Sequence, residues 1–214
     1  MYSKKVLKYF FHPKNVGIIK NPTVKVTEGS LACGDMVTLY LKIDKVSRKI
    51  VDIKFKSYGC AANIATMSFL TELVKGKTIE SVEKLTYKML EKELGGLPPA
   101  KTHCSLLAIK SLKSAIRLYK EKMGEIEYES IDKDFVMSRL RSVIHPAIGK
   151  DIVSSGLVAM ANISDGKVNI KIRIKEKRFR RIVLEEIKER FCIPQIKKIS
   201  VEFVDKDEKA KDKD

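Results

Sequence analysis

Three segments near the N-terminus alternate apolar and polar side chains, and segments of helical period follow them. The alternating segments are TVKVTEG (23–29), MVTLYLKID (36–44) and IVDIKFKSYG (50–59). A period of two residues is typical of half-buried strands. The next segment, AANIATMSFLTELVKG (61–76), has helical period and ends at a glycine. Strands that precede helices predict an α+β fold, in which helices pack on one face of an antiparallel sheet.

Further helices are expected on both sides of these strands. One short helix is predicted for SKKVLKYFF (3–11), before the His12-Pro13 step. Two more are predicted for TIESVEKL (78–85) and YKMLEKEL (87–94). A long helix is predicted from Ser105 to residue 122, because its leucines and isoleucines form a broad apolar stripe. The segment LGGLPPAK, with two glycines and two prolines, is expected to be a loop before that helix.

The second half of the chain has a pattern of its own. It predicts a helix at 134–144, strands at 157–163 and 167–174, a helix at 179–191 and a strand at 196–204. The turn SDG between the first two strands is typical of a hairpin. We therefore expect a second small α/β sandwich. The predicted organisation is a domain at 1–122, a linker at 123–131, a domain at 132–204 and a charged, disordered tail at 205–214.

Composition and charge restrict the classes of function. The chain of 214 residues has a formal net charge of +16, and most of this excess lies in residues 1–122 without an interleaved strip of aromatic side chains. A nucleic-acid-binding protein is therefore not expected. No apolar run approaches the roughly 20 residues that span a bilayer, and the N-terminus lacks the pattern of a signal peptide. We expect a soluble cytoplasmic protein, whose four cysteines stay reduced.

Three of the cysteines lie where one predicted element ends and another begins. Cys33 precedes a strand, Cys60 joins a strand to a helix, and Cys104 lies at the start of the long helix. Asp35 follows the first of them closely, and His103 immediately precedes the last. A buried small cysteine or a capping residue would explain each one alone. Because all five lie at the tips of elements, we expect them to form one metal or cluster site.

Several motifs together resemble the IscU/NifU-N family of iron–sulfur cluster assembly scaffolds. They are YSKKVLKYFFHPKNVG, ACGD, FKSYGCAANIATMSFLTELVKGK and LPPAKTHCSLLAIKSLKSAIRLYK, and they cover residues 2 to about 121 in order. The resemblance implies that Cys33, Asp35, Cys60, His103 and Cys104 bind the metal or cluster. It implies an IscU-like fold and the assembly of a [2Fe–2S] cluster for transfer to apoproteins. The protein would then be a scaffold and carrier that turns over no small substrate, so we do not expect an enzyme.

The resemblance also implies partners and steps. A cysteine desulfurase would pass persulfide sulfur to Cys104, iron would bind at the same donors, and a ferredoxin-like protein would supply electrons. Recipient apoproteins would take the cluster, and Zn²⁺ suits the same donors in the apo form. Tyr2 resembles a terminal tyrosine implicated in self-association, which implies a homodimer. The alternative function is a zinc-bound persulfide sulfurtransferase of SufU type. A hydrolase that pairs Cys104 with His103 is disfavoured, because neighbouring residues rarely orient for proton transfer.

The proline loop is similar to the segment that an Hsp70-type chaperone recognises in IscU proteins. Its residues are Leu97, Pro98, Pro99, Ala100 and Lys101. Ala100 stands where the family usually has valine, which weakens the expectation of chaperone binding. The same loop argues for the IscU branch, because the SufU branch lacks it.

The second domain resembles, more weakly, the small domain of SufT-type factors and of proteins beside Mrp-type carriers. It has His145-Pro146-Ala147 where that family has an acidic motif, and it lacks the expected cysteine. Metal binding is therefore not expected there, and we interpret it as a docking module with a basic patch, or else as a solvated loop and helix start. The residues of that patch are Lys175, Lys177, Arg178, Arg180 and Arg181. Cys192 is predicted to pack in the core, and neither His12 nor His145 is expected to be a ligand.

Overall fold

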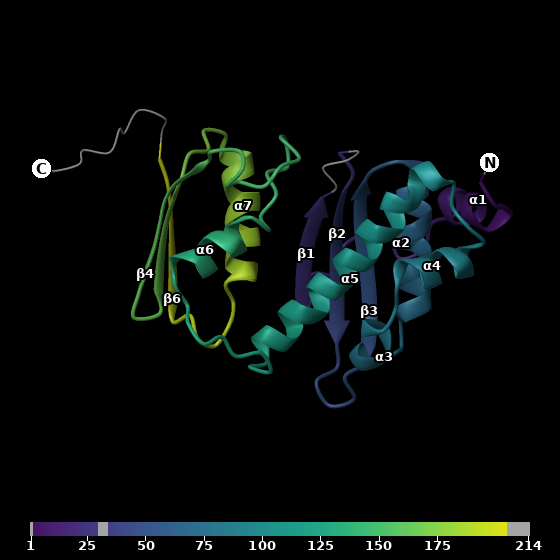
Figure 1. Ribbon diagram of the computed structural model, residues 1–214, viewed down its shortest axis with the longest axis horizontal. Helices are drawn as coiled ribbons and strands as arrows, with labels where there is room; N and C mark the ends of the chain where they lie inside the picture. The colour runs from purple at the N-terminus through teal and green to yellow at the C-terminus, as the bar shows by residue number, and fades with distance from the viewer. Residues whose placement is uncertain (1, 30–33, 205–214) are drawn as a thin grey trace, which may run out of the picture. The chain divides into compact units, whose positions relative to one another are not determined.

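The computed structural model describes residues 2–29 and 34–204, which divide into two compact units (Figure 1). The first unit ends at Tyr119 and the second begins at Lys120. Each unit has a hydrophobic core of its own. Within the described ranges, no helix is both long and apolar enough to cross a membrane.

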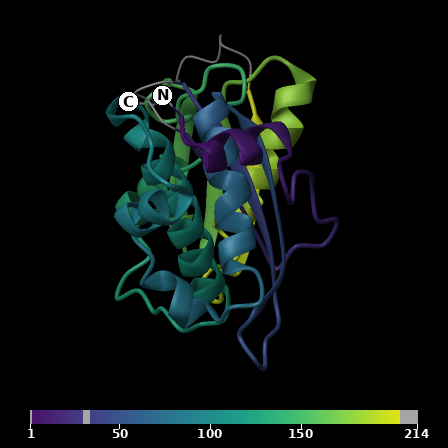
Figure 2. The same cartoon turned by 90° about the vertical axis from the view of Figure 1, so that its right-hand side faces the viewer.

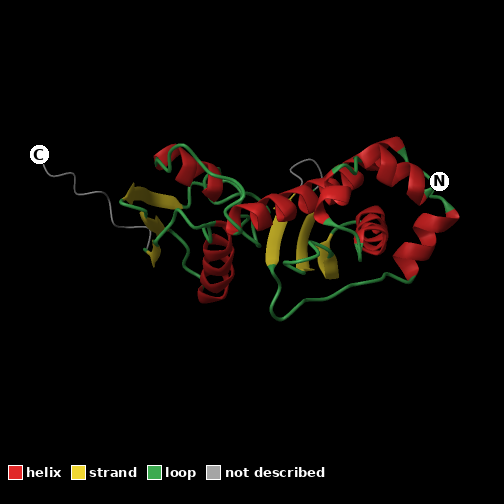
Figure 3. Ribbon diagram, turned by 90° about the horizontal axis from the view of Figure 1, so that it is seen from below, coloured by secondary structure: helices red, strands yellow, loops and turns green. Residues whose placement is uncertain are grey.

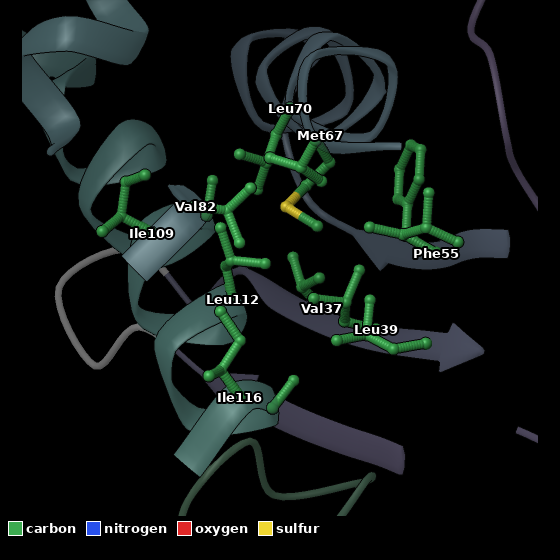
Figure 4. Packing of buried hydrophobic residues seen from close by; sticks show 14 of the residues in the cluster. Val37, Leu39, Phe55, Met67, Leu70, Val82, Ile109, Leu112 and Ile116 are labelled. Atoms are coloured by element: carbon green, nitrogen blue, oxygen red, sulfur yellow. The ribbon is translucent and has the colours of Figure 1, made fainter. Parts of the chain in front are cut away.

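The first unit is built on a three-stranded antiparallel sheet in the order β1-β2-β3. The strands are β1 (Val24–Gly29), β2 (Met36–Ile43) and β3 (Ile50–Tyr58). Every second residue of β2 is buried, from Val37 to Ile43, as its alternating sequence predicts. Figure 4 shows Val37 and Leu39 among side chains of α2 and α5, so these two helices cover one face of the sheet.

The helices of this unit follow the predicted order. They are α1 (Lys4–Phe11), α2 (Ala61–Val74), α3 (Ile79–Glu83), α4 (Tyr87–Leu94), the 3₁₀ turn η1 (Pro99–Lys101) and α5 (Thr102–Lys122). Helix α1 lies across α2 (Figure 2), where the rings of Tyr9 and Phe69 meet edge to face at 5.3 Å. Gly95 ends α4 in a left-handed conformation with φ of 85°, which glycine adopts without steric cost. The α+β fold predicted for this part of the chain is confirmed.

The start of the long helix differs from the prediction. We expected a loop through Lys101 and a helix from Ser105, whereas η1 runs directly into α5 at Thr102. Prolines are tolerated in the first turn of a helix, because the N–H that they lack has no intrahelical partner there. His103 and Cys104 therefore lie in the first turn of α5 and not in the loop before it.

The second unit is a small α/β layer pair. Its elements are α6 (Lys133–Leu140), β4 (Val158–Ser164), β5 (Lys167–Ile172), α7 (Lys177–Arg190) and β6 (Lys198–Phe203). Strand β5 pairs antiparallel with β4 and parallel with β6. Helices α6 and α7 lie on the same face of this sheet (Figure 3). The predicted hairpin is present at Asp165 and Gly166, which both have positive φ, as a tight two-residue turn requires.

Residues around the predicted linker make side-chain contacts within the second unit. Tyr128 packs against Phe135 and donates a hydrogen bond to Glu121, which also pairs with Arg139 at 2.7 Å. The linker at 123–131 and the domain limits around it stay predictions. The tail at 205–214 lies outside the described residues.

Cys192 corrects one prediction, since its side chain is exposed. It lies two residues after the end of α7, between Phe191 and Ile193, which are both buried. The segment after α7 has left helical geometry, so consecutive side chains point to different sides. Apolar neighbours on both sides therefore did not indicate a buried cysteine.

Candidate metal centre

The register of the first sheet brings two predicted donors to one end of the sheet. Met36 at the start of β2 pairs with Tyr58 at the end of β3. Asp35 lies one residue before that pair, and Cys60 lies two residues beyond it as the N-cap of α2. Because the two strands are antiparallel, the start of β2 and the end of β3 lie at the same end of the sheet. The first turn of α5 brings His103 and Cys104 to the same place.

Four of the five predicted donors come together there. Asp35, His103 and Cys104 each offer a ligand atom, and these atoms all lie within 4.8 Å of one another. The sulfur of Cys60 lies 3.7 Å from that of Cys104. Cys33 lies outside the described residues. Among the described residues, the group therefore consists of one carboxylate, one imidazole and two thiols.

The donors differ in how much water reaches them. Asp35 is 7% exposed and Cys104 is 1% exposed, whereas Cys60 is half-buried. Nε2 of His103 is buried and has no hydrogen-bond partner within the described part of the chain. A buried polar atom without a partner is costly, and a metal ion would satisfy it. This orphan nitrogen is an independent sign that the group suits a cation.

Asp35 is held by residues that the sequence reasoning did not single out. Nδ2 of Asn63 donates a hydrogen bond of 3.1 Å to Oδ2 of Asp35, and the hydroxyl of Ser57 donates one of 3.0 Å to Oδ1 of Asn63. The second bond fixes the amide so that its NH₂ group faces the carboxylate. Oδ1 of Asp35 has no hydrogen bond from the described residues and is left for a ligand.

Gly59 completes this cradle by lacking a side chain. A Cβ atom at this position would lie 2.8 Å from Cγ of Asp35, which is closer than real Cβ contacts, and 3.0 Å from Oδ2, which is tighter than most of them. It would also meet Cβ of Asn63 at 3.1 Å. The glycine is therefore required for space, so that the carboxylate can lie between β3 and α2.

Lys101 places a positively charged ammonium group near the thiols of Cys60 and Cys104. The pKa of its ammonium group is raised, first by the charge of Cys60, then by Tyr2, by a hydrogen bond with Cys60 and by Cys104. The first turns of α2 and α5 carry no acidic residue, and their N-terminal dipoles also favour negative charge at this edge. Sequence reasoning placed Lys101 only in a partner-binding loop, although its position two residues before His103 was a signal.

The rest of the predicted loop lies at the surface around η1. Leu97 and Pro98 are half-buried, and Pro99 and Ala100 are exposed. Leu97 packs against the core of the first unit. Of the other histidines, His12 is exposed at the end of α1, and His145 is buried in the second unit.

Comparison with protein families assigns the first part of the chain. The family model described as "NifU-like N terminal domain" matches residues 1–126, more than half of the chain. The chain belongs to this family. All five predicted donors fall inside the NifU-like match. A second model, described as "Iron-sulfur cluster assembly protein", matches residues 133–189.

Curated relatives share the NifU-like part. "Iron-sulfur cluster assembly scaffold protein IscU 1" of Archaeoglobus fulgidus is 47% identical over 127 residues, or 59% of this chain and 82% of that protein. The scaffold protein IscU of Aquifex aeolicus is 43% identical over 129 residues, or 60% of this chain and 82% of that protein. The N-terminal part of a NifU-like protein from Brucella abortus, a solved structure, has a TM-score of 0.48 at 23% identity and covers 56% of this chain and 94% of that one.

Proposed function

We propose that this protein is a scaffold on which an iron–sulfur cluster is assembled and from which the cluster passes to apoproteins. The observation that carries the proposal is the convergence of Asp35, His103, Cys60 and Cys104 at one edge of the first sheet. Relatives that are named as assembly scaffolds share this part of the chain. The role requires a binding and releasing site and no turnover of a small substrate.

The spacing of the thiols supports binding of a single ion as a first step. Two thiolates bound at about 2.3 Å to one tetrahedral ion lie about 3.8 Å apart. The sulfurs of Cys60 and Cys104 are 3.7 Å apart, which is close to this value. Fe²⁺ or Zn²⁺ could therefore bind with little rearrangement. We propose Cys33, Asp35, Cys60, His103 and Cys104 as the donors for iron, for Zn²⁺ in the apo form, and for a [2Fe–2S] cluster.

The mixture of donors suits a cargo that must leave. Thiolates hold iron–sulfur clusters tightly. A carboxylate oxygen and an imidazole nitrogen are harder ligands, and they weaken the preference of the site for a sulfide-bridged iron pair. Asp35 and His103 would thus allow the cluster to be transferred, while the cysteines bind it tightly enough to prevent its loss before transfer.

Sulfur would enter through Cys104. Its thiolate would attack the outer sulfur of a desulfurase persulfide, forming a persulfide on Cys104 and releasing the desulfurase thiolate. Two electrons from a ferredoxin-like donor would then cleave the new S–S bond into sulfide and the Cys104 thiolate. Because Cys104 is 1% exposed, this step requires the η1–α5 turn to open. Gly95 and Gly96, with φ of 85° and 88°, precede that turn and can serve as its hinge.

The proposed partners follow from these steps. They are a cysteine desulfurase, a ferredoxin-like electron donor and recipient apoproteins. An Hsp70-type chaperone would bind at Leu97–Lys101, where Pro99 and Ala100 are exposed. Lys101 also interacts with Cys60. A chaperone that bound this segment would therefore move the positive charge of Lys101 away from the thiols. Such a contact would connect chaperone binding to cluster release.

Anaerobic reconstitution tests the proposal. The protein is supplied with Fe²⁺, cysteine, a cysteine desulfurase and a reductant, and iron, acid-labile sulfide and visible absorption are measured. We expect two irons and two sulfides per cluster, with Cys60→Ala losing the absorption. Cys192→Ala is the matched control, because this cysteine is exposed and belongs to the second unit, outside the group of predicted donors. A protein that stays colourless while it retains one zinc would instead support the zinc-bound sulfurtransferase.

A further inference from the structure

The second unit contains a cavity that shares one residue, Lys175, with the basic patch interpreted above as a docking surface. The cavity has a volume of about 360 Å³ and lies where the end of β5 meets the start of α7. This volume is at the lower end of the range for small-molecule sites, roughly 300–1,000 Å³. Leu157, Ile174 and Phe179 supply apolar walls. The walls therefore suit a small ligand with a hydrocarbon body.

His145 is the buried polar group of this cavity. Its side chain is 5% exposed, and its ring meets the ring of Phe179 edge to face at 5.0 Å. The backbone N–H of Ala147 donates to Nδ1 at 3.3 Å. Nδ1 is thus an acceptor, and the proton of the neutral ring lies on Nε2. Nε2 makes no hydrogen bond to a described residue, although the carboxylate of Glu176 is near enough to act on the charge of the ring, so this donor remains available at the cavity wall.

The polar end of the cavity is mainly positive. Arg173 and Lys175 line it, and Glu176 contributes one exposed carboxylate. Helix α7 starts here, and its first turn has Lys177 and Arg178 and no acidic residue. Glu176 is the N-cap, but its side chain makes no capping hydrogen bond. The free N–H groups and the dipole of a helix start favour an anion, whereas cations alone are unfavourable there.

We propose that this cavity binds a small organic anion, with its carboxylate at Arg173, Lys175 and His145 and its hydrocarbon body against Leu157 and Ile174. The bound carboxylate would accept the hydrogen bond that Nε2 of His145 has to give. It would also neutralise the positive charge at the start of α7. All residues that line this cavity belong to the second unit, and the proposal does not rest on cluster assembly.

Histidine NMR of the full-length chain tests this site with sodium hexanoate as the probe. The chain has three histidines, and His145→Gln identifies the ring signals of His145. We expect hexanoate to shift these signals to saturation and to leave those of His12 unchanged. Hexylammonium, which has the same number of carbons and the opposite charge, should give no saturating shift. Inorganic phosphate, which lacks the body, should bind at least about tenfold more weakly, a difference of about 1.4 kcal/mol.

Two arginine variants make the test specific. Arg173→Gln should weaken hexanoate binding by about tenfold, because it removes a charged contact. Arg181→Gln is the matched control, since this arginine is exposed on α7, pairs with Glu185 and does not line the cavity. Equal affinity in the two variants would overturn the proposal, as would hexylammonium or phosphate that binds as tightly as hexanoate. Absence of any saturating shift with hexanoate would also overturn it.

Discussion

Asn63 donates a hydrogen bond of 3.1 Å to Asp35 from the first turn of α2, where it is 1% exposed. Ser57 orients its amide, so Asn63 can present only donors to the carboxylate. We expect Asn63→Ala to weaken Zn²⁺ binding by about tenfold to a hundredfold, the usual effect of removing a residue that orients a ligand. Competition titration with a chromophoric chelator measures the affinity.

The control for this variant lies on the same helix. Thr66 is also buried, but its hydroxyl bonds the carbonyl of Ala62 in its own helix and does not reach Asp35. Thr66→Ala should leave the Zn²⁺ affinity within about twofold of the parent. The absorption spectrum of bound Co²⁺ adds a readout of ligand geometry, which should change in Asn63→Ala alone. Equal affinities in the two variants would contradict a positioning role for Asn63.

Gly59 leads to a prediction about packing. A Cβ at this position would lie 2.8 Å from Cγ of Asp35, so Gly59→Ala forces the carboxylate out of its place. Overpacking of this kind costs about 1–3 kcal/mol in the free energy of unfolding. In an Asp35→Ala background the obstacle is gone, and we expect most of this cost to disappear. Urea unfolding of the four proteins in this double-mutant cycle measures the coupling, and additive effects would show that the cost arises elsewhere.

The elements of the fold were predictable where the signal is local. The alternation of β2 and the helical period of α2 depend only on neighbouring residues, and both elements are present. The start of α5 was missed because prolines usually mark loops, whereas here Pro99 begins a turn that continues into the helix. Cys192 was misjudged because buried neighbours do not fix the direction of a side chain beyond a helix end.

The site was predictable in its donors more than in their support. Cysteine, histidine and aspartate stand out in a sequence because their chemistry is specific. Asn63 does not, since its role depends on Asp35, which is 28 residues away in the chain and reaches it only through the sheet register. The same holds for Gly59, whose missing side chain matters only beside a carboxylate that another strand supplies. Support of this kind is a property of the fold and not of a motif.

The buried imidazole of His145 predicts a dependence of stability on pH. Burial lowers its pKa below the ordinary value, and the charge of Glu176 opposes this shift only in part. Arg173 and Lys175 line the same cavity as His145. The unfolded chain therefore takes up the proton at a higher pH than the folded unit does. The contribution to stability is complete above about pH 6.5 and is lost as the pH falls from there through the folded-state pKa.

Hydrogen exchange of the β5 amides measures this effect in the second unit alone. Between pH 7.5 and 5.5, we expect the free energy of opening to fall more in the parent than in His145→Gln, which cannot take up the proton. His12→Gln should behave as the parent does, because His12 is exposed at the end of α1 in the first unit. An equal decrease in all three proteins would assign the pH dependence to other groups.

A buried ion pair in the second unit predicts a large loss of stability on truncation. Arg139 pairs with Glu121 at 2.7 Å, donates to the carbonyl of Arg190 at 2.7 Å and stacks on Phe135. Its side chain is 10% exposed and that of Glu121 is 4% exposed. Arg139→Met leaves the carboxylate buried without this cation, which costs about 3–5 kcal/mol. Adding Glu121→Gln should restore more than half of that, because the side chain that lost its cation is then uncharged.

The exposed pair of Arg181 and Glu185 is the matched comparison. It joins residues four apart on α7, with both side chains more than half exposed, and such pairs contribute about 0.3–0.5 kcal/mol. Arg181→Met should therefore change the urea midpoint very little. A cost for Arg139→Met no larger than that for Arg181→Met would contradict this argument, because it would show that the carboxylate of Glu121 does not depend on Arg139 for compensation.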